Sequence, residues 1–263
     1  MKSRHPQPAI SSLRRRIELQ RQRLERGEST PSGQVPAAAD RSLDVDQSID
    51  PSTASSDHFC EAFMTLPPVA EETLFLDLET TGLGGEALIF LVGLLHREGD
   101  CYRLRQWFCH DVVAEGRVLL RLAKELARRP TVVTYNGDSF DLPFIDRRMR
   151  FHRLDGVPAG VSSVDLLAVV RKCYRKSWPD CRLATAEKRL LKKQRSAVDV
   201  PGKEAPLRFQ DFKAGGPAGL IEPVIYHNRI DLTSLAALLP ILTSLDDSKG
   251  APRDAIFCPG GFT

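Results

Sequence analysis

Dense apolar runs broken by glycine begin near residue 73 and define the first part of a folded domain. Three of these runs follow one another with only short turns between them, at 73–80, 87–97 and 101–109. Runs of this length that are bounded by turn residues are typical of strands, and short turns join neighbouring antiparallel strands. The pattern therefore predicts a three-strand antiparallel meander.

Helical spacing of apolar residues takes over after the meander. It predicts a series of helices, at 115–129, 141–151, 162–175 with a serine N-cap, 181–193 and 226–245. The short apolar run at 131–136 predicts a buried strand, whereas 198–219 has the composition of an irregular connection, of a length typical of functional or mobile loops. This order predicts an α/β fold with a mixed sheet, one half antiparallel and the other parallel, flanked by helices.

The two ends of the chain differ in composition from this central part. Residues 1–30 carry eight Lys or Arg and three Glu with apolar residues at helical spacing, which predicts a basic amphipathic helix. A helix of this kind is more often exposed to solvent or partly docked on the protein than dedicated to binding a nucleic acid or a partner. Residues 31–60 are rich in Ser, Pro and Asp, which predicts a disordered linker. The expected organisation is then completed by one folded domain at 61–250 and a tail at 251–263.

Overall composition excludes several classes of protein. The net charge is only +3, and the six cysteines include no C-x-x-C pair, which argues against zinc-ribbon and redox motifs. No apolar run approaches the roughly 18 residues of a membrane span. The N-terminus also lacks the apolar stretch of a signal peptide. We therefore expect a cytoplasmic protein without a membrane contact or a small-molecule organic cofactor.

Two acids stand in the middle of the first expected strand. Asp77 and Glu79 are two residues apart, so strand alternation places both on one face with Phe75, while leucines occupy the other face. Adjacent buried carboxylates repel each other and are costly to desolvate unless a cation neutralises them. Oxygen ligands suit Mg²⁺ or Mn²⁺. A solvated strand end explains the same two residues equally well.

Two further acids lie at expected helix starts. Asp141 follows the strand at 131–136, at the edge where α/β sheets place ligand-binding groups, although helix capping also explains an Asp there. Asp231 lies four residues after His227, so the two share one helix face. Interaction with the helix dipole is an alternative role for Asp231, and core packing is an alternative role for His227.

The three acidic segments together resemble a known family. D-L-E-T-T-G, then N-x-x-x-F-D, then a Tyr or His shortly before an Asp resemble the three motifs of the DEDD superfamily of 3′-to-5′ exonucleases, which have an RNase H-like fold. The middle motif is also similar to that of the proofreading domains of family B DNA polymerases. Outside these motifs, four stretches resemble the bacterial YprB-like ribonuclease H-like proteins: FLVGLL, CRLATAEKRLL, DVPGKEAP and HNRIDLTSLAALL. The resemblance covers about residues 73 to 245.

This resemblance implies a two-metal site and a catalytic base. Two Mg²⁺ or Mn²⁺ ions are held in such enzymes by the acids that correspond to Asp77, Glu79, Asp141 and Asp231. Families with a tyrosine base place it four residues before the last Asp and families with histidine usually five, whereas this chain has His227 at four and Tyr226 at five. We expect His227 to be the base because its near-neutral pKa suits that role.

Other residues near these motifs are expected to contact substrate. Thr80 is a candidate by family analogy, although an ordinary turn role is equally consistent. Asn136 and Phe140 are expected to line the cleft, with Phe140 as a platform for base stacking or, equally, as part of the core. Tyr226 is a further candidate for substrate contact. Asp165 has a capping-type context with Ser162, which favours a structural role over a metal-assisting one.

A basic segment precedes the last helix. Residues 171–195 contain ten Lys or Arg and two acids, with Tyr174 and Trp178 interleaved, and this composition favours a phosphate-binding surface that includes Lys192 and Lys193. The leading hypothesis is thus a 3′-to-5′ exonuclease acting on single-stranded DNA or RNA ends. The alternatives are a nucleic-acid-binding module with weak or no catalysis and a structure-specific endonuclease on the same fold.

Overall fold

The computed structural model describes residues 44–49, 66, 69–99, 101–196 and 199–247. The chain divides into residues 1–41 and residues 42–263, and all described residues belong to the second unit. The expected basic helix at 1–30, most of the expected linker at 31–60 and the tail at 251–263 lie outside the described residues.

A mixed sheet forms the centre of this unit, as predicted. Its described strands lie in the order β1-β4-β3-β2-β5-β6. The first four in that order pair antiparallel, whereas β2 with β5 and β5 with β6 pair parallel. The strands are β1 Asp44–Ile49, β2 Thr73–Thr80, β3 Ile89–Glu98, β4 Cys101–Phe108, β5 Thr131–Thr134 and β6 Ser162–Asp165.

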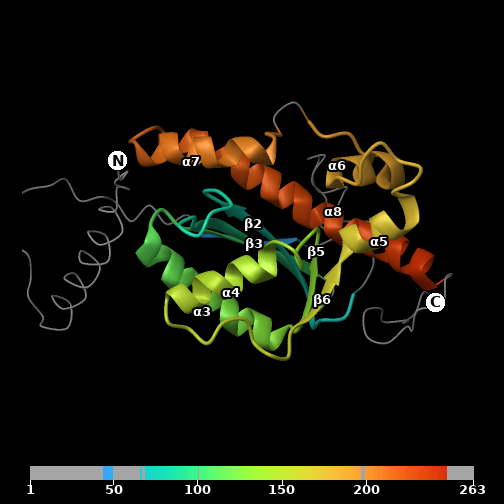
Figure 1. The fold of residues 1–263 in the computed structure, drawn as a ribbon, viewed down its shortest axis with the longest axis horizontal. Helices are drawn as coiled ribbons and strands as arrows, with labels where there is room; N and C mark the ends of the chain where they lie inside the picture. Colours follow the sequence, from blue (N-terminus) through green and yellow to red (C-terminus); the bar gives the residue numbers. More distant parts are fainter. Residues whose placement is uncertain (1–43, 50–65, 67–68, 100, 197–198, 248–263) are drawn as a thin grey trace, which may run out of the picture. The chain divides into compact units, whose positions relative to one another are not determined.

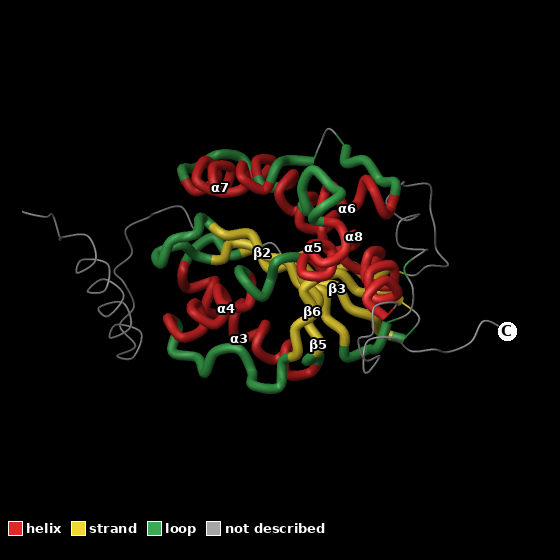
Figure 2. Tube along the Cα trace, turned by 45° about the vertical axis from the view of Figure 1, so that its right-hand side comes forward, coloured by secondary structure: helices red, strands yellow, loops and turns green. Residues whose placement is uncertain are grey.

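Helices cover both faces of the sheet. Figure 1 shows α3 and α4 on one side of the strands and α7 and α8 on the other, and Figure 2 shows the same layers from a second direction. The helices are α3 Val112–Arg128, α4 Asp141–Phe151, α5 Leu166–Tyr174, α6 Leu183–Ala186, α7 Ala205–Lys213 and α8 Glu222–Asp247. Short helical turns lie at η1 Glu187–Leu191, η2 Gly202–Glu204 and η3 Ala218–Leu220.

The two faces of β2 belong to two different cores, as its alternation predicts. Leu74, Leu76 and Leu78 pack with apolar residues of α3 and α4. Phe75 packs with residues of α5 and α8 on the opposite face. Because Asp77 and Glu79 alternate with the leucines, both carboxylates are directed toward the face that α8 covers.

Two elements differ from the sequence expectation in their type. Residues 44–49 form strand β1 against β4, so the expectation of disorder throughout 31–60 is wrong for these six residues. The expected helix at 162–175 begins only at Leu166, because 162–165 pair with β5 as strand β6 and Asp165, not Ser162, caps the helix. Pairing with a neighbour distant in sequence overrides local propensity in both places.

Three further segments differ from the expectation. The expected helix at 181–193 is divided into α6 and the π-helix η1, and the connection at 198–219 contains helix α7. Helix α8 begins at Glu222, four residues before the predicted start at Tyr226. Within the described part of the chain, none of the helices has the length and apolar character needed to cross a membrane.

Candidate metal centre beside helix α8

The acid pair lies in the middle of the sheet. Asp77 pairs with Gly93 and Glu79 with Leu91 across β3, and the register shifts directly after Glu79. Such a bulge increases the local twist of a strand and is frequent next to functional sites. Glu79 is only 7% exposed. A solvated strand end therefore does not describe these two acids.

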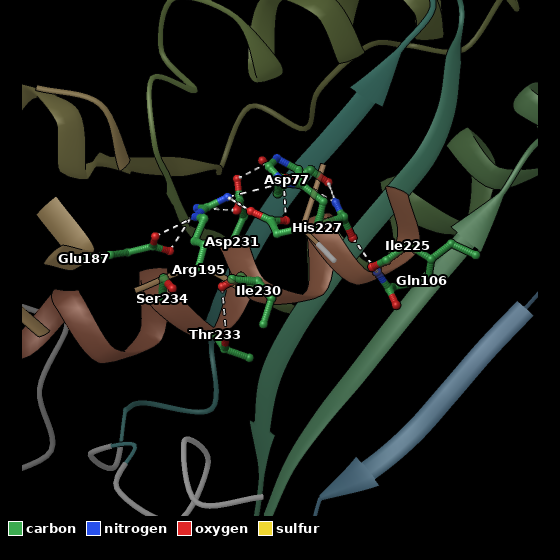
Figure 3. A network of polar contacts seen from close by, with 12 residues as sticks. Asp77, Gln106, Glu187, Arg195, Ile225, His227, Ile230, Asp231, Thr233 and Ser234 are labelled. Atoms are coloured by element: carbon green, nitrogen blue, oxygen red, sulfur yellow. Dashed lines mark hydrogen bonds and ion pairs between the residues drawn. The ribbon is translucent and has the colours of Figure 1, made fainter. Parts of the chain in front are cut away.

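A relay of buried amides holds Asp77 in place. Asn228 of α8 donates from Nδ2 to the backbone oxygen of Asp77 at 3.1 Å and to its Oδ2 at 2.8 Å. Gln106 of β4 donates to Asn228 Oδ1 at 2.7 Å and to the backbone oxygen of Ile225 at 2.8 Å (Figure 3). The relay needs glycine at position 93, since a Cβ there would lie 2.1 Å from Asn228 Oδ1.

Asp141 is the first residue of α4 and does not cap that helix. The cap position is Phe140, and no side chain accepts a cap hydrogen bond there. The turn before it depends on Asn136, whose φ of 76° lies in the left-handed region, and on Gly137, where a Cβ would collide with the side chain of Thr134. This turn places Asp141, 5% exposed, beside β2, so the capping alternative does not describe it.

Asp231 lies in the third turn of α8, too far from the helix start for the dipole explanation to apply. Its Oδ1 forms an ion pair with the Arg195 guanidinium at 2.7 Å. Arg195 also forms a fork with Glu187, through Nε at 2.6 Å and through a terminal nitrogen at 2.9 Å, and reaches Asp199 Oδ2 at 3.2 Å. One guanidinium therefore contacts three carboxylates, and Figure 3 shows it between Glu187 and Asp231.

The backbone explains how Arg195 returns to Glu187, eight residues earlier. Glu187 opens the π-helix, a rare element that is frequent at functional sites, and its side chain is fully buried. Lys192 ends this helix with a left-handed φ of 57°, and the chain then reverses direction. Sequence reasoning assigned Arg195 to a basic surface and gave no role to Glu187 or Asp199. The stretches CRLATAEKRLL and DVPGKEAP, which resemble YprB-like proteins, contain Glu187 and Asp199 and so mark both positions. Local pattern does not show which residue each one contacts, because the contacts depend on the path of the chain after the π-helix.

His227 lies between two carboxylates. Its Nδ1 is 2.8 Å from Asp199 Oδ1, and its Nε2 is 3.6 Å from Asp231 Oδ2. The short contact with Asp199 requires a proton on Nδ1, so Nε2 is the free acceptor of the neutral ring. Arg195 also approaches Nδ1, at 3.3 Å, through its pairing with Asp199. Tyr226, one residue earlier, instead lies under the guanidinium of Arg229 at 5.3 Å.

The four predicted acids perturb one another. Burial raises the pKa of Asp77 well above its usual range, and the charges of Asp231, Glu79 and Asp141 raise it further. Burial, followed by Asp231 and Asp141, does the same for the pKa of Glu79. Burial also raises the pKa of Asp141 to about 7, although hydrogen bonds from backbone amides lower it. Burial raises the pKa of Asp231 as well, although the charges of His227 and Arg195 lower it. The structure thus brings all four acids together with less positive charge than they need.

The donor set fits a hard divalent cation. Four carboxylates from β2, α4 and α8 supply the oxygen ligands that Mg²⁺ and Mn²⁺ prefer, and their mutual repulsion is the condition that a cation relieves. Among the residues that the structure describes, however, no group of three or more His, Cys, Asp or Glu is arranged to hold a metal ion. Asp231 is paired with Arg195 and Asp77 with Asn228, so metal binding at these acids requires Asp231 to exchange its partner.

The other predicted contact residues have varied surroundings. Thr80 is buried and donates to the backbone oxygen of Gly82, the turn role, and Phe140 packs against Phe144 in the core. Asp165 accepts from the backbone amides of Asn136 and Leu167, which is a structural role. Lys192 is exposed, and its Nζ donates to the backbone oxygen of Arg189 in the preceding turn.

Lys193 differs from Lys192 in its direction. Its Nζ donates to Ser234 Oγ of α8 at 3.2 Å, and burial lowers the pKa of its ammonium while nearby Glu187 raises it. Lys193 therefore lies beside the carboxylate cluster and not on an open surface.

Comparison with known proteins gives this geometry a family context. Over 168 residues the chain is 32% identical to the uncharacterized protein YprB of Bacillus subtilis, a match that covers 62% of this chain and 40% of YprB. Over 88 residues it is 33% identical to DNA polymerase 1 of Aeropyrum pernix, covering 34% of this chain and 9% of the polymerase. The chain spans less than half the length of these curated relatives.

Among solved structures, the chain is similar to the family B DNA polymerase from the hyperthermophilic archaeon Pyrobaculum calidifontis. The TM-score is 0.52 at 18% identity, and the match covers 71% of this chain and 26% of the polymerase. This likeness concerns the fold alone. A model of the RNase H superfamily matches residues 74–243, from the start of β2 to the last turns of α8, and the chain therefore belongs to the RNase H superfamily.

Proposed function

We propose that this protein is a metal-dependent 3′-to-5′ exonuclease that hydrolyses phosphodiester bonds at the ends of single-stranded DNA or RNA by a two-metal-ion mechanism. The observation that carries the proposal is the gathering of Asp77, Glu79, Asp141 and Asp231 from β2, α4 and α8 into one cluster, where each carboxyl has a raised pKa. Membership of the RNase H superfamily supports nuclease chemistry and a divalent metal. The direction of cleavage rests on the resemblance of the three motifs to DEDD exonucleases.

The proposed ligands of Mg²⁺ or Mn²⁺ are the four carboxylates. When bound, such ions activate a water molecule and stabilise the charge on the leaving oxygen. The residues of this chain fix the ligands before the metal arrives. Asn228 restrains one oxygen of Asp77, and the rigid turn before α4 aims Asp141 at β2. Preorganised ligands lose little freedom on binding, which favours catalysis.

We assign the general base to His227. Asp199 accepts the Nδ1 proton, which leaves Nε2 available to take a proton from water near Asp231. Tyr226 has no such contact with a carboxylate in the described structure, and its ring is covered by Arg229. The proposal thus gives the role of a positioning residue to Asp199, which lies outside the three acidic motifs but opens the stretch DVPGKEAP.

The test of the proposed activity uses 5′-labelled single strands of DNA and RNA with Mg²⁺ or Mn²⁺. The expected products shorten progressively from the 3′ end, and Asp77→Asn lowers the rate by roughly a thousandfold or more while the protein remains folded. The matched control is Asp155→Asn, the same change at an exposed carboxylate, which leaves the rate unaltered. Cleavage that survives Asp77→Asn or excess EDTA would contradict the metal mechanism.

A separate experiment decides the base. The cleavage rate is measured for His227→Ala, Tyr226→Phe and Asp199→Asn. His227→Ala is expected to lower the rate strongly, and Asp199→Asn to lower it less, because the imidazole remains but loses the carboxylate that orients it. Loss of activity in Tyr226→Phe alone would transfer the role to the tyrosine.

One observation favours a second function. Arg195 already neutralises Asp231, and this pairing is compatible with a nucleic-acid-binding module that has little catalysis. The same assay separates the two, since a binding module retains labelled strands at every metal concentration tested without shortening them. Circular single strands provide the third arm, because only an endonuclease cuts a substrate without ends.

A further inference from the structure

A pocket of about 670 Å³ lies outside the carboxylate cluster, between the end of β5, helix α5 and the segment that leads to α6. Figure 1 shows α6 above α5 at this side of the molecule. The lining residues come from these three elements: Tyr135, Asn136, Leu167, Arg171, Arg175, Trp178, Pro179, Asp180, Cys181, Arg182 and Leu183. None of the proposed metal ligands is among them.

The lining combines positive charge with an apolar wall. Three arginines and one aspartate line the pocket, which leaves a formal surplus of two positive charges. The aspartate, Asp180, is already engaged, because it accepts from the hydroxyl of Thr185 at 2.6 Å and from the backbone amide of Arg182 at 3.0 Å. Its charge also acts on Arg182, so the positive surplus of the lining lies at Arg171 and Arg175. Leucine, proline and tryptophan side chains complete the wall.

Internal contacts hold the pocket open. Tyr135, directly after β5, donates its hydroxyl proton to the backbone oxygen of Cys181 at 2.6 Å. Trp178 stacks on Tyr174 with ring centroids 4.1 Å apart and planes 8° from parallel. The backbone amide of Trp178 donates to the oxygen of Tyr174 as well. These contacts fix the segment between α5 and α6 on the end of the sheet, so a ligand meets a preformed surface.

Asn136 connects the pocket with the proposed metal centre. It lines the pocket, and its carbonyl oxygen accepts from the amide of Phe140, one residue before Asp141. The left-handed backbone of Asn136 is held by Asp165, which accepts from its amide at 2.7 Å. The pocket therefore opens at the base of the turn that carries one metal ligand.

Guanidinium groups beside an apolar wall match the chemistry of a nucleotide, because its phosphate pairs with the guanidinium groups and its base packs against the apolar side chains. We propose that this pocket binds one nucleotide of the substrate strand, upstream of the bond that is cleaved, with Arg171 and Arg175 on its phosphates and Trp178 beside its base. The inference rests on the proposed function, which supplies the strand and the direction from which it enters.

The test measures binding without catalysis. Anisotropy of a labelled single-stranded oligonucleotide is titrated in EDTA with the full chain carrying Asp77→Asn. Adding Arg171→Ala and Arg175→Ala is expected to weaken binding about tenfold near physiological salt and to reduce the slope of log affinity against log salt by roughly 1.4, from two phosphate contacts on a single strand. Trp178→Ala is expected to weaken binding without changing that slope. The matched control is Arg117→Ala with Lys124→Ala, two exposed cations of α3 on the other face of the sheet.

A second arm separates a nucleotide within a strand from a free one. Nucleoside monophosphate is added as a competitor and is expected to displace the oligonucleotide only at far higher concentration. Equal competition by the monophosphate, or equal loss of affinity in the control and pocket variants, would overturn the proposal. Because binding is measured in EDTA, a wild-type protein that fails to cleave while the pocket variants still lose affinity defeats the proposed function and leaves the pocket supported.

Discussion

Charged residues are buried on both faces of the sheet, and the two faces treat them differently. On the face covered by α3 and α4, Glu115 is fully buried and accepts two hydrogen bonds from Arg148, one from the amide of Ile89 and one contact from His152. Burial alone raises the pKa of Glu115, but the contacts with His152, Arg148 and the Ile89 amide outweigh it and the pKa is lowered.

The face covered by α8 shows the opposite balance. Asp77, Glu79 and Asp231, together with the neighbouring Asp141 at the start of α4, have raised pKa values. Arg195 neutralises Asp231 while it also contacts Glu187 and Asp199. A satisfied buried ion pair is consistent with a structural role, whereas an uncompensated cluster is costly and persists where a ligand completes it. The balance of charge, more than the burial of charge, distinguishes the two sites.

The sharpest way to break this comparison is to neutralise one acid on each face. Glu115→Gln is expected to lower the free energy of unfolding by about 3–5 kcal/mol, because the Arg148 guanidinium stays buried without its charged partner. Glu79→Gln in EDTA is expected to leave it unchanged or raise it, since a repulsive charge is removed. Urea denaturation measures both, with Glu98→Gln as the exposed control. Equal losses at positions 115 and 79 would refute the distinction.

A buried histidine on the face covered by α3 is expected to make the free energy of unfolding depend on pH. Burial lowers the pKa of His96 to about 4, helped by the charges of Arg129 and Arg105, and its ring nitrogens have no hydrogen-bond partner among the described residues. The unfolded chain binds this proton below about pH 6.5 and the native protein only below about 4, so the histidine costs the native state stability as the pH falls through that window.

His96→Leu is therefore expected to retain about 3 kcal/mol more of its neutral-pH stability at pH 4 than the wild type does. The measurement is the urea midpoint of each protein between pH 7 and pH 4, and His110→Leu, a change at a less buried histidine, serves as the control. Parallel curves for wild type and His96→Leu would show that this histidine titrates normally.

Metal addition tests the incomplete balance of the α8 face directly. Mg²⁺ or Mn²⁺ at a hundredfold excess over its dissociation constant is expected to stabilise the wild type by about 2.7 kcal/mol and to raise its melting temperature. Asp231→Asn is expected to lose most of that stabilisation, whereas Glu115→Gln keeps it despite a lower starting temperature. Thermal denaturation measures the shift in melting temperature, with metal-free samples in EDTA as the reference. A wild-type melting curve that is unchanged at every metal concentration would contradict the proposed metal centre.

The smallest expected effect concerns the partner exchange at Asp231. Arg195→Lys keeps the charge but loses the fork that joins Glu187 to Asp231, so Asp231 is freed for metal. Calorimetric titration with Mn²⁺ is expected to show affinity higher by roughly tenfold or less, the scale of one charged contact. Arg150→Lys, at an exposed ion pair, is the control. Weaker binding in Arg195→Lys would mean that the guanidinium supports the metal site.

The sequence by itself determined the antiparallel meander, the parallel strand β5 and the two faces of β2, because alternation and turn residues are local properties of the chain. It also identified the acids at positions 77, 79, 141 and 231 through motifs of short span. The tertiary structure was needed for strand β6 and strand β1, which exist because they pair with partners far away in sequence.

Only the tertiary structure decided how the acids are surrounded. The contact of Arg195 with Asp231, the support of His227 by Asp199 and the relay from Gln106 through Asn228 to Asp77 join residues 28 to 151 positions apart. Local patterns of polarity cannot encode such pairs, because a basic residue in a basic segment has the same appearance whether it faces solvent or a buried carboxylate. Chain reversal after the π-helix and the packing of α8 across β2 make that choice, since burial without compensation is costly and folding brings the charges together.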